Sequence, residues 1–181
     1  MKRAVFLDRD GVINKSLLVN GIPTPPRSLE QLQILPGVNE GLEILRKSEF
    51  ELVVVTNQPD VARGKMPKRV VEAIHMNLEA ELRIHHFYTC FHDDADDCQC
   101  RKPKSGLLKQ AAGELNLNLQ SSFMVGDRWR DISAGQSVGC RCFFIDNLLD
   151  ERQPVAPFVR VSSLFEAAQL ILKESDVEIS R

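Results

Sequence analysis

Four segments of this chain carry residues that could act on a phosphate group. The segments are Asp8-Arg9-Asp10-Gly11, Thr56-Asn57-Gln58, Arg101-Lys102-Pro103-Lys104 and Gly126-Asp127-Arg128-Trp129-Arg130-Asp131. Together they supply carboxylates, a hydroxyl, amides and cations, which is the set that phosphoryl transfer to a carboxylate nucleophile with a hard divalent metal requires. Each segment alone has a plainer interpretation, as a turn, a helix cap or a solvated surface. Their occurrence together and in this order favours the chemistry.

A scaffold must bring these distant segments to one place. Short apolar runs alternate with longer stretches of helical period, which is typical of an α/β fold built on a mostly parallel sheet. We expect strands at 4–7, 52–55, 87–91, 122–125 and 142–145, and helices at 37–48, 67–83, 104–117, 129–138 and 163–173. Ligands bind outside the carboxyl ends of the strands in such sheets. The pattern therefore predicts one site at that edge of the sheet.

A second set of residues has the spacing of metal ligands. The pattern Cys90-x-His92-x5-Cys98-x-Cys100 matches a closed structural Zn²⁺ site with four protein ligands. The intervening Asp93-Asp94-Ala95-Asp96-Asp97 is too polar for a hydrophobic core, and we interpret this acidic run as a solvated face of the loop. A zinc-stabilised loop would hold Arg101 and Lys102, which follow it directly, in a rigid position.

The remaining cysteines and histidines predict no chemistry. Cys140 and Cys142 flank an arginine at the edge of a strand, and we interpret them as small packing residues. We interpret His75, His85 and His86 as structural residues in the same way. Trp129 is either an exposed aromatic residue beside the acidic segment or a packing residue.

The chain resembles the haloacid dehalogenase-like (HAD) phosphatases over residues 4–145. The resemblance is carried by Phe6-Leu7-Asp8-Arg9-Asp10-Gly11-Val12-Ile13-Asn14, Thr56-Asn57-Gln58, Lys102, and Gly126-Asp127 with Asp131. It implies a three-layer, Rossmann-like HAD fold that forms a single domain over residues 1–175, followed by a frayed tail at 176–181. The short intervals from Asp8 to Thr56 and from Thr56 to Lys102 leave no room for a large cap domain.

The resemblance also implies roles for the acidic residues. Asp8 would attack the phosphorus and become an aspartyl phosphate. Asp10 would protonate the leaving oxygen and later activate water. Mg²⁺ would be held by the carboxylates of Asp8 and Asp127 and by the backbone carbonyl of Asp10. The charges of the metal and of Lys102 would cancel the repulsion between a carboxylate and a phosphate dianion.

Two sets of substrate contacts follow from the same resemblance. Around the transferred phosphoryl group, the expected contacts are Thr56, Asn57, Gln58 and Lys102, of which Thr56 and Lys102 are expected to take part in catalysis. For the remainder of the substrate, the expected contacts are Ser16, Val19, Arg63, Arg101 and Arg128. Three of these are arginines, which suits a substrate that carries a second phosphate.

Details of the motifs indicate the class of substrate. The zinc loop directly before Arg101-Lys102-Pro103, together with Ala62-Arg63-Gly64, resembles the group of HAD phosphatases that act on a heptose 1,7-bisphosphate or on histidinol phosphate. The features favour removal of the 7-phosphate of D-glycero-D-manno-heptose 1,7-bisphosphate. The alternative is an amino-alcohol phosphate such as histidinol phosphate, or another small sugar phosphate. Pro59-Asp60 and Ser105-Gly106 stand where the family usually carries Ser-Gly and Pro-Gly, so one loop loses a backbone donor and gains a negative charge.

Composition limits the other classes of function. The 181 residues carry 23 Lys and Arg against 25 Asp and Glu, so the charge balance gives no reason to expect a nucleic-acid partner. No apolar run approaches the length of a membrane span, and we expect a cytoplasmic monomer without membrane attachment. The alternative of another class is a catalytically silent, zinc-stabilised scaffold that binds a phosphorylated ligand. The intact set of Asp8, Asp10, Thr56, Lys102 and Asp127 favours an enzyme.

Overall fold

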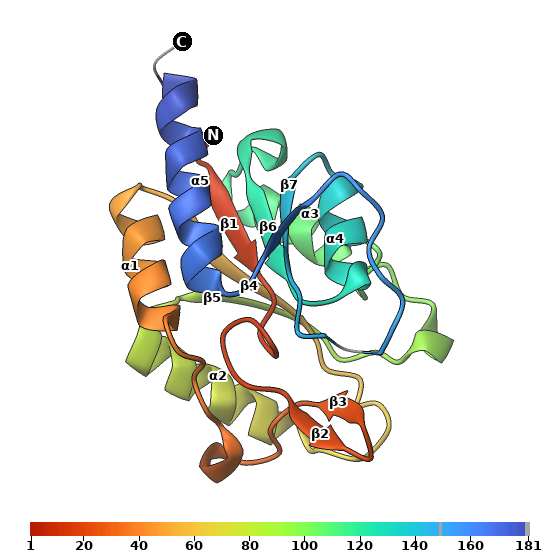
Figure 1. The fold of residues 1–181 in the computed structure, drawn as a ribbon. Helices are drawn as coiled ribbons and strands as arrows, with labels where there is room; N and C mark the ends of the chain where they lie inside the picture. The colour runs from red at the N-terminus through yellow and green to blue at the C-terminus, as the bar shows by residue number, and fades with distance from the viewer. Residues whose placement is uncertain (149, 180–181) are drawn as a thin grey trace.

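A parallel sheet forms the centre of the molecule. The computed structural model describes residues 1–148 and 150–179, and within them six strands form this sheet in the order β5-β4-β1-β6-β7-β8 (Figure 1). The strands are β1 (Ala4–Leu7), β4 (Glu51–Asn57), β5 (His86–Cys90), β6 (Phe123–Gly126), β7 (Arg141–Ile145) and β8 (Val159–Val161). The chain runs outward from β1 through β4 to β5 and then returns to β6 on the other side of β1. Ligands bind at such a switch in strand order.

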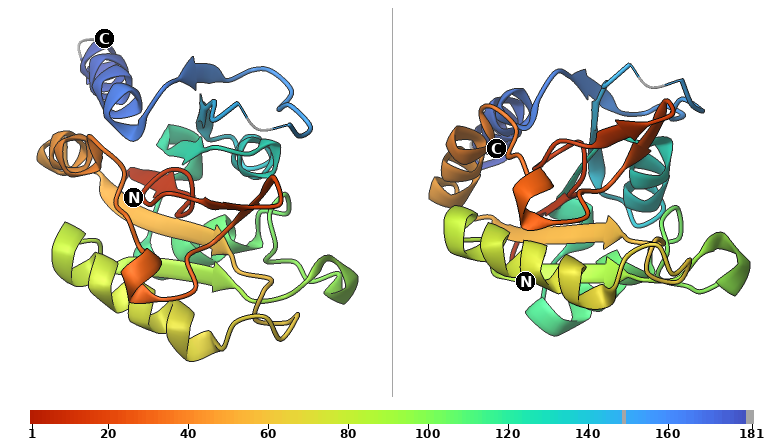
Figure 2. Two further views of the ribbon diagram at one scale, coloured as in Figure 1. Left: turned by 60° about the horizontal axis from the view of Figure 1, so that its bottom comes forward. Right: turned by 90° about the horizontal axis from the view of Figure 1, so that it is seen from below.

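Helices cover both faces of the sheet. They are α1 (Val38–Lys47), α2 (Lys68–Leu82), α3 (Gly106–Leu115), α4 (Trp129–Gln136) and α5 (Leu164–Ile179), with short 3₁₀ turns at η1 (Leu29–Gln31), η2 (Asp94–Asp96) and η3 (Leu119–Ser121). Apolar residues of α1, α2 and α5 pack on one face, and those of α3 and α4 pack on the other (Figures 1 and 2). The expected three-layer α/β fold is confirmed.

The side chains of β1 show why the sequence forms a sheet that is covered on both faces. Val5 and Leu7 belong to the core beneath α1, α2 and α5, whereas Ala4 and Phe6 belong to the core beneath α3 and α4. Successive residues of a strand point to opposite faces, so a continuous apolar run is what burial on both faces requires. All four residues are 0% exposed.

Three elements differ from the sequence predictions. A hairpin of β2 (Leu17–Val19) and β3 (Ile22–Thr24) forms where no strand was expected. Its turn is Asn20-Gly21, where both residues have positive φ, at 53° and 77°, as tight hairpin turns require. Strand β8 was not expected because it is only three residues long. Helix α5 continues to Ile179, so residues 176–179 of the expected tail are helical, and 180–181 lie outside the described residues.

The segments at which a cap domain could be inserted are short. Between β1 and α1 the chain forms the β2–β3 hairpin and η1, and between β4 and α2 it forms the loop 58–67. The β2–β3 hairpin lies beyond the end of the sheet toward which β1 points (Figure 1). Among the residues that the structure describes, no helix is both long and apolar enough to cross a membrane.

Candidate active site

The register of the central strands brings the predicted segments together. Leu7 is paired with Val54 on one side and with Val125 on the other, and the backbone N–H of Asp8 donates to the carbonyl of Val125 at 3.0 Å. The residues that follow these positions therefore meet at the carboxyl edge of the sheet, as predicted.

Two glycines make the close approach at this edge possible. Gly11 has a φ of 89°, and a Cβ at this position would lie 2.0 Å from Oδ2 of Asp127. A Cβ at Gly126 would lie 2.1 Å from the Cβ of Asp131. Since real Cβ atoms do not approach so closely, a residue with a side chain at either position would displace a carboxylate of the site.

Lys102 lies at the centre of the buried charges. Its Nζ donates to Oδ1 of Asp8 at 2.8 Å and to the carbonyl of Val55 at 2.7 Å, and it lies 2.6 Å from Oδ1 of Asp131. Although burial alone would lower the pKa of Lys102, the charges of Asp131 and Asp8 raise it. Burial raises the pKa of Asp8 to about 6, against the opposing effect of Lys102.

Three carboxylates next to Lys102 have the arrangement of a metal site. Oxygens of Asp8, Asp127 and Asp131 lie within 4.8 Å of one another, and all three residues are buried. Oδ2 of Asp127 accepts from Nδ2 of Asn147 at 3.1 Å, whereas Oδ1 is buried without a hydrogen-bond partner. Burial and the charges of Asp8 and Asp131 raise the pKa of Asp127 well above its usual range. An all-oxygen set with an unpartnered buried oxygen fits a hard divalent cation.

Asp131 was not among the predicted ligands. The sequence analysis used it only as part of a motif, although it lies four positions after Asp127 in the first turn of α4. In the structure its Oδ1 lies beside Lys102, and its Oδ2 accepts from the backbone N–H of Arg128 at 2.9 Å. This side chain therefore closes the first turn of the helix as well as contributing charge to the site.

The side chain of Asp10 is held by donors on several sides. Nη2 of Arg9 donates to both of its oxygens at 3.1 and 3.0 Å, Nδ2 of Asn14 donates at 2.9 Å, and Nε2 of Gln58 donates at 2.8 Å. Gln58 also donates to Oγ1 of Thr56 at 2.9 Å and is 0% exposed. The predicted substrate contact of Gln58 is therefore wrong: it lies behind the wall of the site and supports two residues of that wall.

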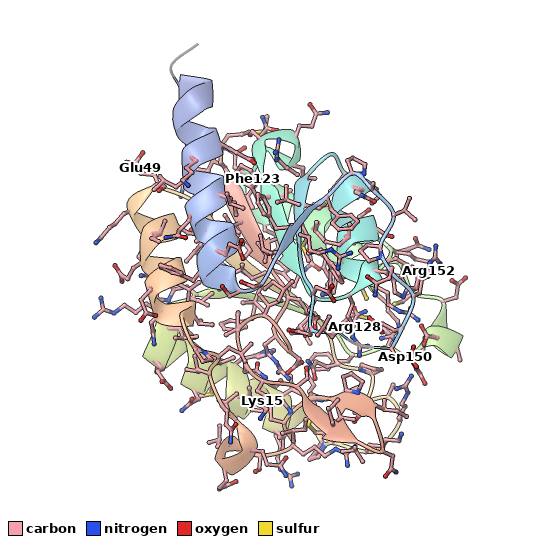
Figure 3. All side chains as sticks on the ribbon, viewed as in Figure 1. Lys15, Glu49, Phe123, Arg128, Asp150 and Arg152 are labelled. Atoms are coloured by element: carbon pink, nitrogen blue, oxygen red, sulfur yellow. The ribbon has the colours of Figure 1, made fainter. Side chains whose placement is uncertain are left out.

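A cavity of about 320 Å³ opens in front of these residues. Of the predicted residues, its lining contains Asp8, Asp10, Ser16, Thr56, Asn57, Arg63, Arg101, Lys102 and Arg128. Val19 is not among the lining residues but is paired with Ile22, which lines the cavity, so its contact with the substrate stays a prediction. Asp127 instead lines an adjoining hollow of about 160 Å³, together with Ser16, Lys15 and Asn147. Lys15 and Arg128 are labelled in Figure 3, where both lie below the strands of the sheet.

The cavity also contains cations that the sequence did not indicate. Arg27 and Arg130 join Arg63, Arg101 and Arg128, so that five arginines line one cavity. The Trp129 side chain is half-buried, and the guanidinium groups of Arg130 and Arg152 lie 4.9 and 4.3 Å from the centre of its ring. Trp129 is thus a support for arginines rather than an isolated exposed aromatic residue.

Aspartates of the acidic run hold several of these arginines. Asp93 accepts from Arg63 at 2.8 and 2.5 Å, and Asp94 accepts from Arg101 at 2.8 Å and from Arg130 at 3.2 Å. The interpretation of this run as a merely solvated face is therefore wrong. The unusual Asp60 is likewise paired, with Nη2 of Arg27 at 3.3 Å.

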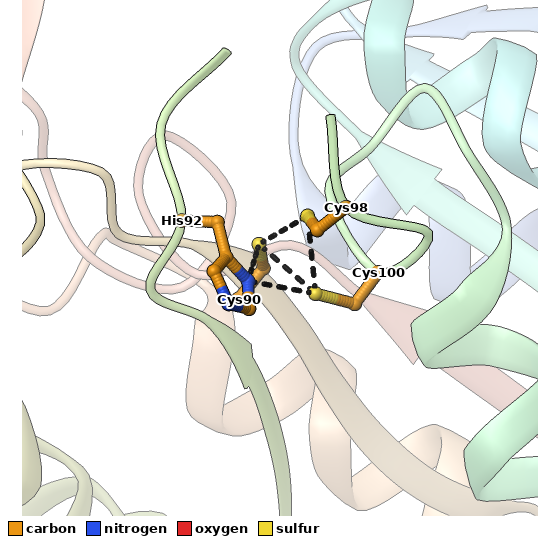
Figure 4. A group of neighbouring side chains, drawn as sticks. All are labelled: Cys90, His92, Cys98 and Cys100. Carbon is orange, nitrogen blue, oxygen red and sulfur yellow. Dashed lines mark hydrogen bonds between the residues drawn. The ribbon is translucent and has the colours of Figure 1, made fainter. Parts of the chain in front are cut away.

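The predicted zinc ligands form one compact cluster. Five distances between the ligand atoms of Cys90, His92, Cys98 and Cys100 lie between 3.2 and 3.6 Å (Figure 4). Tetrahedral ligands about 2.3 Å from a Zn²⁺ ion are about 3.7 Å apart. Burial raises the pKa of the Cys90 and Cys100 thiols, whereas hydrogen bonds from these neighbours lower the pKa of Cys98 to about 7 against the effect of its burial. The donor set and its geometry fit a structural zinc ion.

Comparison with known proteins relates this site to a family. Residues 26–139 match the family model of the haloacid dehalogenase-like hydrolases. A D-glycero-beta-D-manno-heptose-1,7-bisphosphate 7-phosphatase of Pasteurella multocida is 37% identical over 75% of this chain and 77% of its own length. A D-glycero-alpha-D-manno-heptose-1,7-bisphosphate 7-phosphatase of Photorhabdus laumondii is 30% identical over 93% of this chain and 96% of its own.

The fold has a counterpart among solved structures. The crystal structure of the D,D-heptose 1,7-bisphosphate phosphatase from B. bronchiseptica, complexed with magnesium and phosphate, matches with a TM-score of 0.83 and 27% sequence identity. The match covers 96% of this chain and 99% of that one.

Proposed function

Because this chain belongs to the haloacid dehalogenase-like hydrolases and is a phosphatase of that family, we propose that it removes the 7-phosphate of D-glycero-D-manno-heptose 1,7-bisphosphate. The observation that carries the proposal is the cavity itself, in which Asp8, Asp10 and Lys102 face the same space as five arginines. One phosphate would lie against the carboxylates and Lys102. Arginines suit the second phosphate because the planar guanidinium binds it through two parallel hydrogen bonds.

The first chemical step is a transfer of the phosphoryl group to Asp8. A carboxylate oxygen of Asp8 forms a bond to phosphorus while the bond between phosphorus and the sugar oxygen breaks, and Asp10 gives a proton to that oxygen. Lys102 offsets the charge of Asp8 and of the phosphoryl oxygens, and Thr56 and Asn57 donate hydrogen bonds to those oxygens. The product is an aspartyl phosphate and the free sugar hydroxyl.

The second step restores the enzyme. A water molecule attacks the phosphorus while Asp10 accepts its proton, the acyl phosphate bond breaks, and inorganic phosphate leaves. Asp8, Asp127, the carbonyl of Asp10 and the adjacent Asp131 would hold Mg²⁺, which would supply positive charge against the phosphoryl oxygens. The unpartnered Oδ1 of Asp127 supports this assignment of the metal site.

The raised pKa of Asp8 leads to a prediction about pH. Burial raises the pKa of Asp8 to about 6, so below this pH the carboxyl is protonated in the metal-free protein. A cation must then displace this proton, and also a proton on Asp127, whose pKa burial raises as well, so the half-saturating Mg²⁺ concentration should rise at least about tenfold for each pH unit below 6. Phosphate release measured across a Mg²⁺ series at pH 5, 6 and about 7.5 checks this. An unchanged half-saturating concentration would contradict it.

The substrate assignment is tested by comparing phosphate esters on one preparation with Mg²⁺. The esters are the alpha and beta anomers of the heptose bisphosphate, histidinol phosphate and an aryl phosphate. The proposal expects kcat/KM to be highest for a heptose bisphosphate, by about tenfold or more over histidinol phosphate. A preference for histidinol phosphate would mean that histidinol phosphate is the substrate, while the phosphatase mechanism through Asp8 would still hold. Release of phosphate from none of the esters would support the silent scaffold instead.

A variant of Arg63 tests whether the arginines bind the second phosphate. Arg63→Gln should raise KM for the heptose bisphosphate by about tenfold, because one charge-assisted contact is lost. It should leave KM for the aryl phosphate, which has no second phosphate, nearly unchanged. Arg69 is exposed on α2 outside the cavity, and Arg69→Gln is the matched control. Equal changes of KM for both substrates would argue against this role of Arg63.

We further propose that the Cys90-His92-Cys98-Cys100 cluster holds a structural zinc ion. The purified protein should contain about one zinc per chain. Cys98→Ser should lose most of it and lower the melting temperature by about 5 °C or more, because metal binding contributes to folding. Cys140→Ser is the control, since the Cys140 thiol lies outside the cluster and donates to the carbonyl of Leu119, as a serine hydroxyl can. Full zinc content in Cys98→Ser would rule out this site.

A further inference from the structure

Arg9 is a fully buried cation between two functional segments of the chain. It separates Asp8 from Asp10 in the sequence, and its side chain is 0% exposed. On one side its Nη2 donates to both oxygens of Asp10, at 3.1 and 3.0 Å. On the other side its Nη1 lies 3.1 Å from Nε2 of His75 in α2. The guanidinium group thus connects Asp10 to a histidine that the sequence analysis interpreted as merely structural.

The protonation of His75 follows from this contact. Arginine remains a cation in proteins, so its N–H donates and Nε2 of His75 must accept. The ring is then neutral and carries its proton on Nδ1. Burial and the charge of Arg9 lower the pKa of His75 to about 3, which agrees with a neutral ring. The ring is also stacked on Phe87 of β5, with centroids 4.7 Å apart and planes inclined by 21°, so its orientation is determined by packing.

The contact between His75 and Arg9 determines where Asp10 can lie. Asn14 and Gln58 each donate to one oxygen of Asp10, whereas Arg9 donates to both and therefore orients the plane of the carboxylate. Without His75 as an acceptor, an N–H of the buried guanidinium would have no partner. The guanidinium would turn or admit water, and Asp10 would turn with it.

We propose that His75 is a positioning residue for proton transfer, which holds Arg9 so that Asp10 is aimed at the leaving-group oxygen. The proposal rests on the role of Asp10 given above. When Asp10 releases its proton to the sugar oxygen, a carboxylate forms. The guanidinium group of Arg9, which His75 orients, stabilises this carboxylate by hydrogen bonds. When water attacks in the second step, the same orientation directs Asp10 toward the proton that it accepts.

The test uses two variants of nearly equal size. Gln places a hydrogen-bond acceptor where Nε2 of His75 lies, whereas Met has a similar length and no strong acceptor. His75→Met should lower kcat/KM for the heptose bisphosphate about tenfold, while His75→Gln should retain most of it. His85→Met is the matched control, because His85 is exposed and pairs with Glu79. It should leave kcat/KM unchanged.

A second substrate distinguishes the loss of Asp10 positioning from a general loss of active-site structure in His75→Met. A dinitrophenyl phosphate has a leaving group that needs no proton, and kcat/KM reports the steps up to the first bond cleavage. His75→Met should therefore change kcat/KM for this ester less than about twofold. Equal losses for both substrates, or no loss for either, would overturn the inference while leaving the proposed phosphatase intact. A parent protein that hydrolyses neither ester would overturn both.

A measurement on the unmodified protein keeps the inference testable if His75→Met does not fold. Nitrogen NMR of the His75 ring at pH 7 should show a neutral imidazole that is protonated at Nδ1 and accepts a hydrogen bond at Nε2. A ring protonated at Nε2, or a charged ring, would exclude the contact with Arg9 and overturn the inference.

Discussion

Replacing Asp8 by Asn should reduce the turnover of every phosphate ester by about 10⁴-fold or more. The amide has nearly the shape of the carboxylate but lacks the charge and the nucleophilic oxygen that form the bond to phosphorus. The protein should still fold. Burial raises the pKa of Asp8 to about 6, which means that the buried carboxylate is itself unfavourable at pH 7, and the neutral amide relieves this cost.

Steady-state phosphate release and thermal unfolding of the same preparation check this prediction. Asp97→Asn is a suitable control, because Asp97 is an exposed aspartate that pairs with Lys104 at the surface. It should keep the parent's activity. Turnover by Asp8→Asn at about a tenth of the parent's rate, in a folded sample, would mean that Asp8 is not the nucleophile.

Replacing Lys102 by Met should damage both stability and activity. Lys102 is 2% exposed and lies between Asp8 and Asp131, so its loss leaves two buried carboxylates facing each other without compensation. Removing one partner of a buried ion pair typically costs about 3–5 kcal/mol. The loss of positive charge beside the phosphoryl group should lower kcat by about 10²-fold or more.

The loss of stability in Lys102→Met should depend on Mg²⁺ if repulsion between the two carboxylates causes it. A divalent cation that binds the same carboxylates would replace part of the lost charge, so added Mg²⁺ should raise the melting temperature of Lys102→Met more than that of the parent. Lys104→Met is the control, since Lys104 is a half-buried residue that pairs with the exposed Asp97 away from the buried carboxylates. A Lys102→Met protein that melts at the parent's temperature would refute the role of Lys102 at the centre of the charges.

The sequence was informative where a short-range pattern determines structure. The apolar run of β1 alternates between two cores, and this requires a sheet covered on both faces, which in turn brings Asp8, Thr56 and Asp127 to one edge. The compact Cys/His cluster was predicted for the same reason. Cys90, His92, Cys98 and Cys100 lie within one loop, and their spacing alone brings them together.

Other features depend on contacts between distant segments, and no local pattern reveals them. Gln58 follows Thr56 and Asn57 in a motif, but its side chain turns inward to Asp10, which is 48 positions away. The acidic run between the zinc ligands has the composition of a solvated loop, yet Asp93 and Asp94 pair with arginines of the cavity.

The central claim is that Asp8 carries the phosphoryl group during turnover, and trapping the intermediate tests it most directly. Protein quenched in acid during turnover is reduced with borohydride, which converts an acyl phosphate to an alcohol, and peptide mass mapping then locates the modified residue. We predict that the aspartate-derived alcohol, homoserine, is found at position 8 and is absent when substrate is omitted. Modification at another carboxylate, such as Asp127 or Asp131, or rapid turnover with no modified residue, would contradict the account.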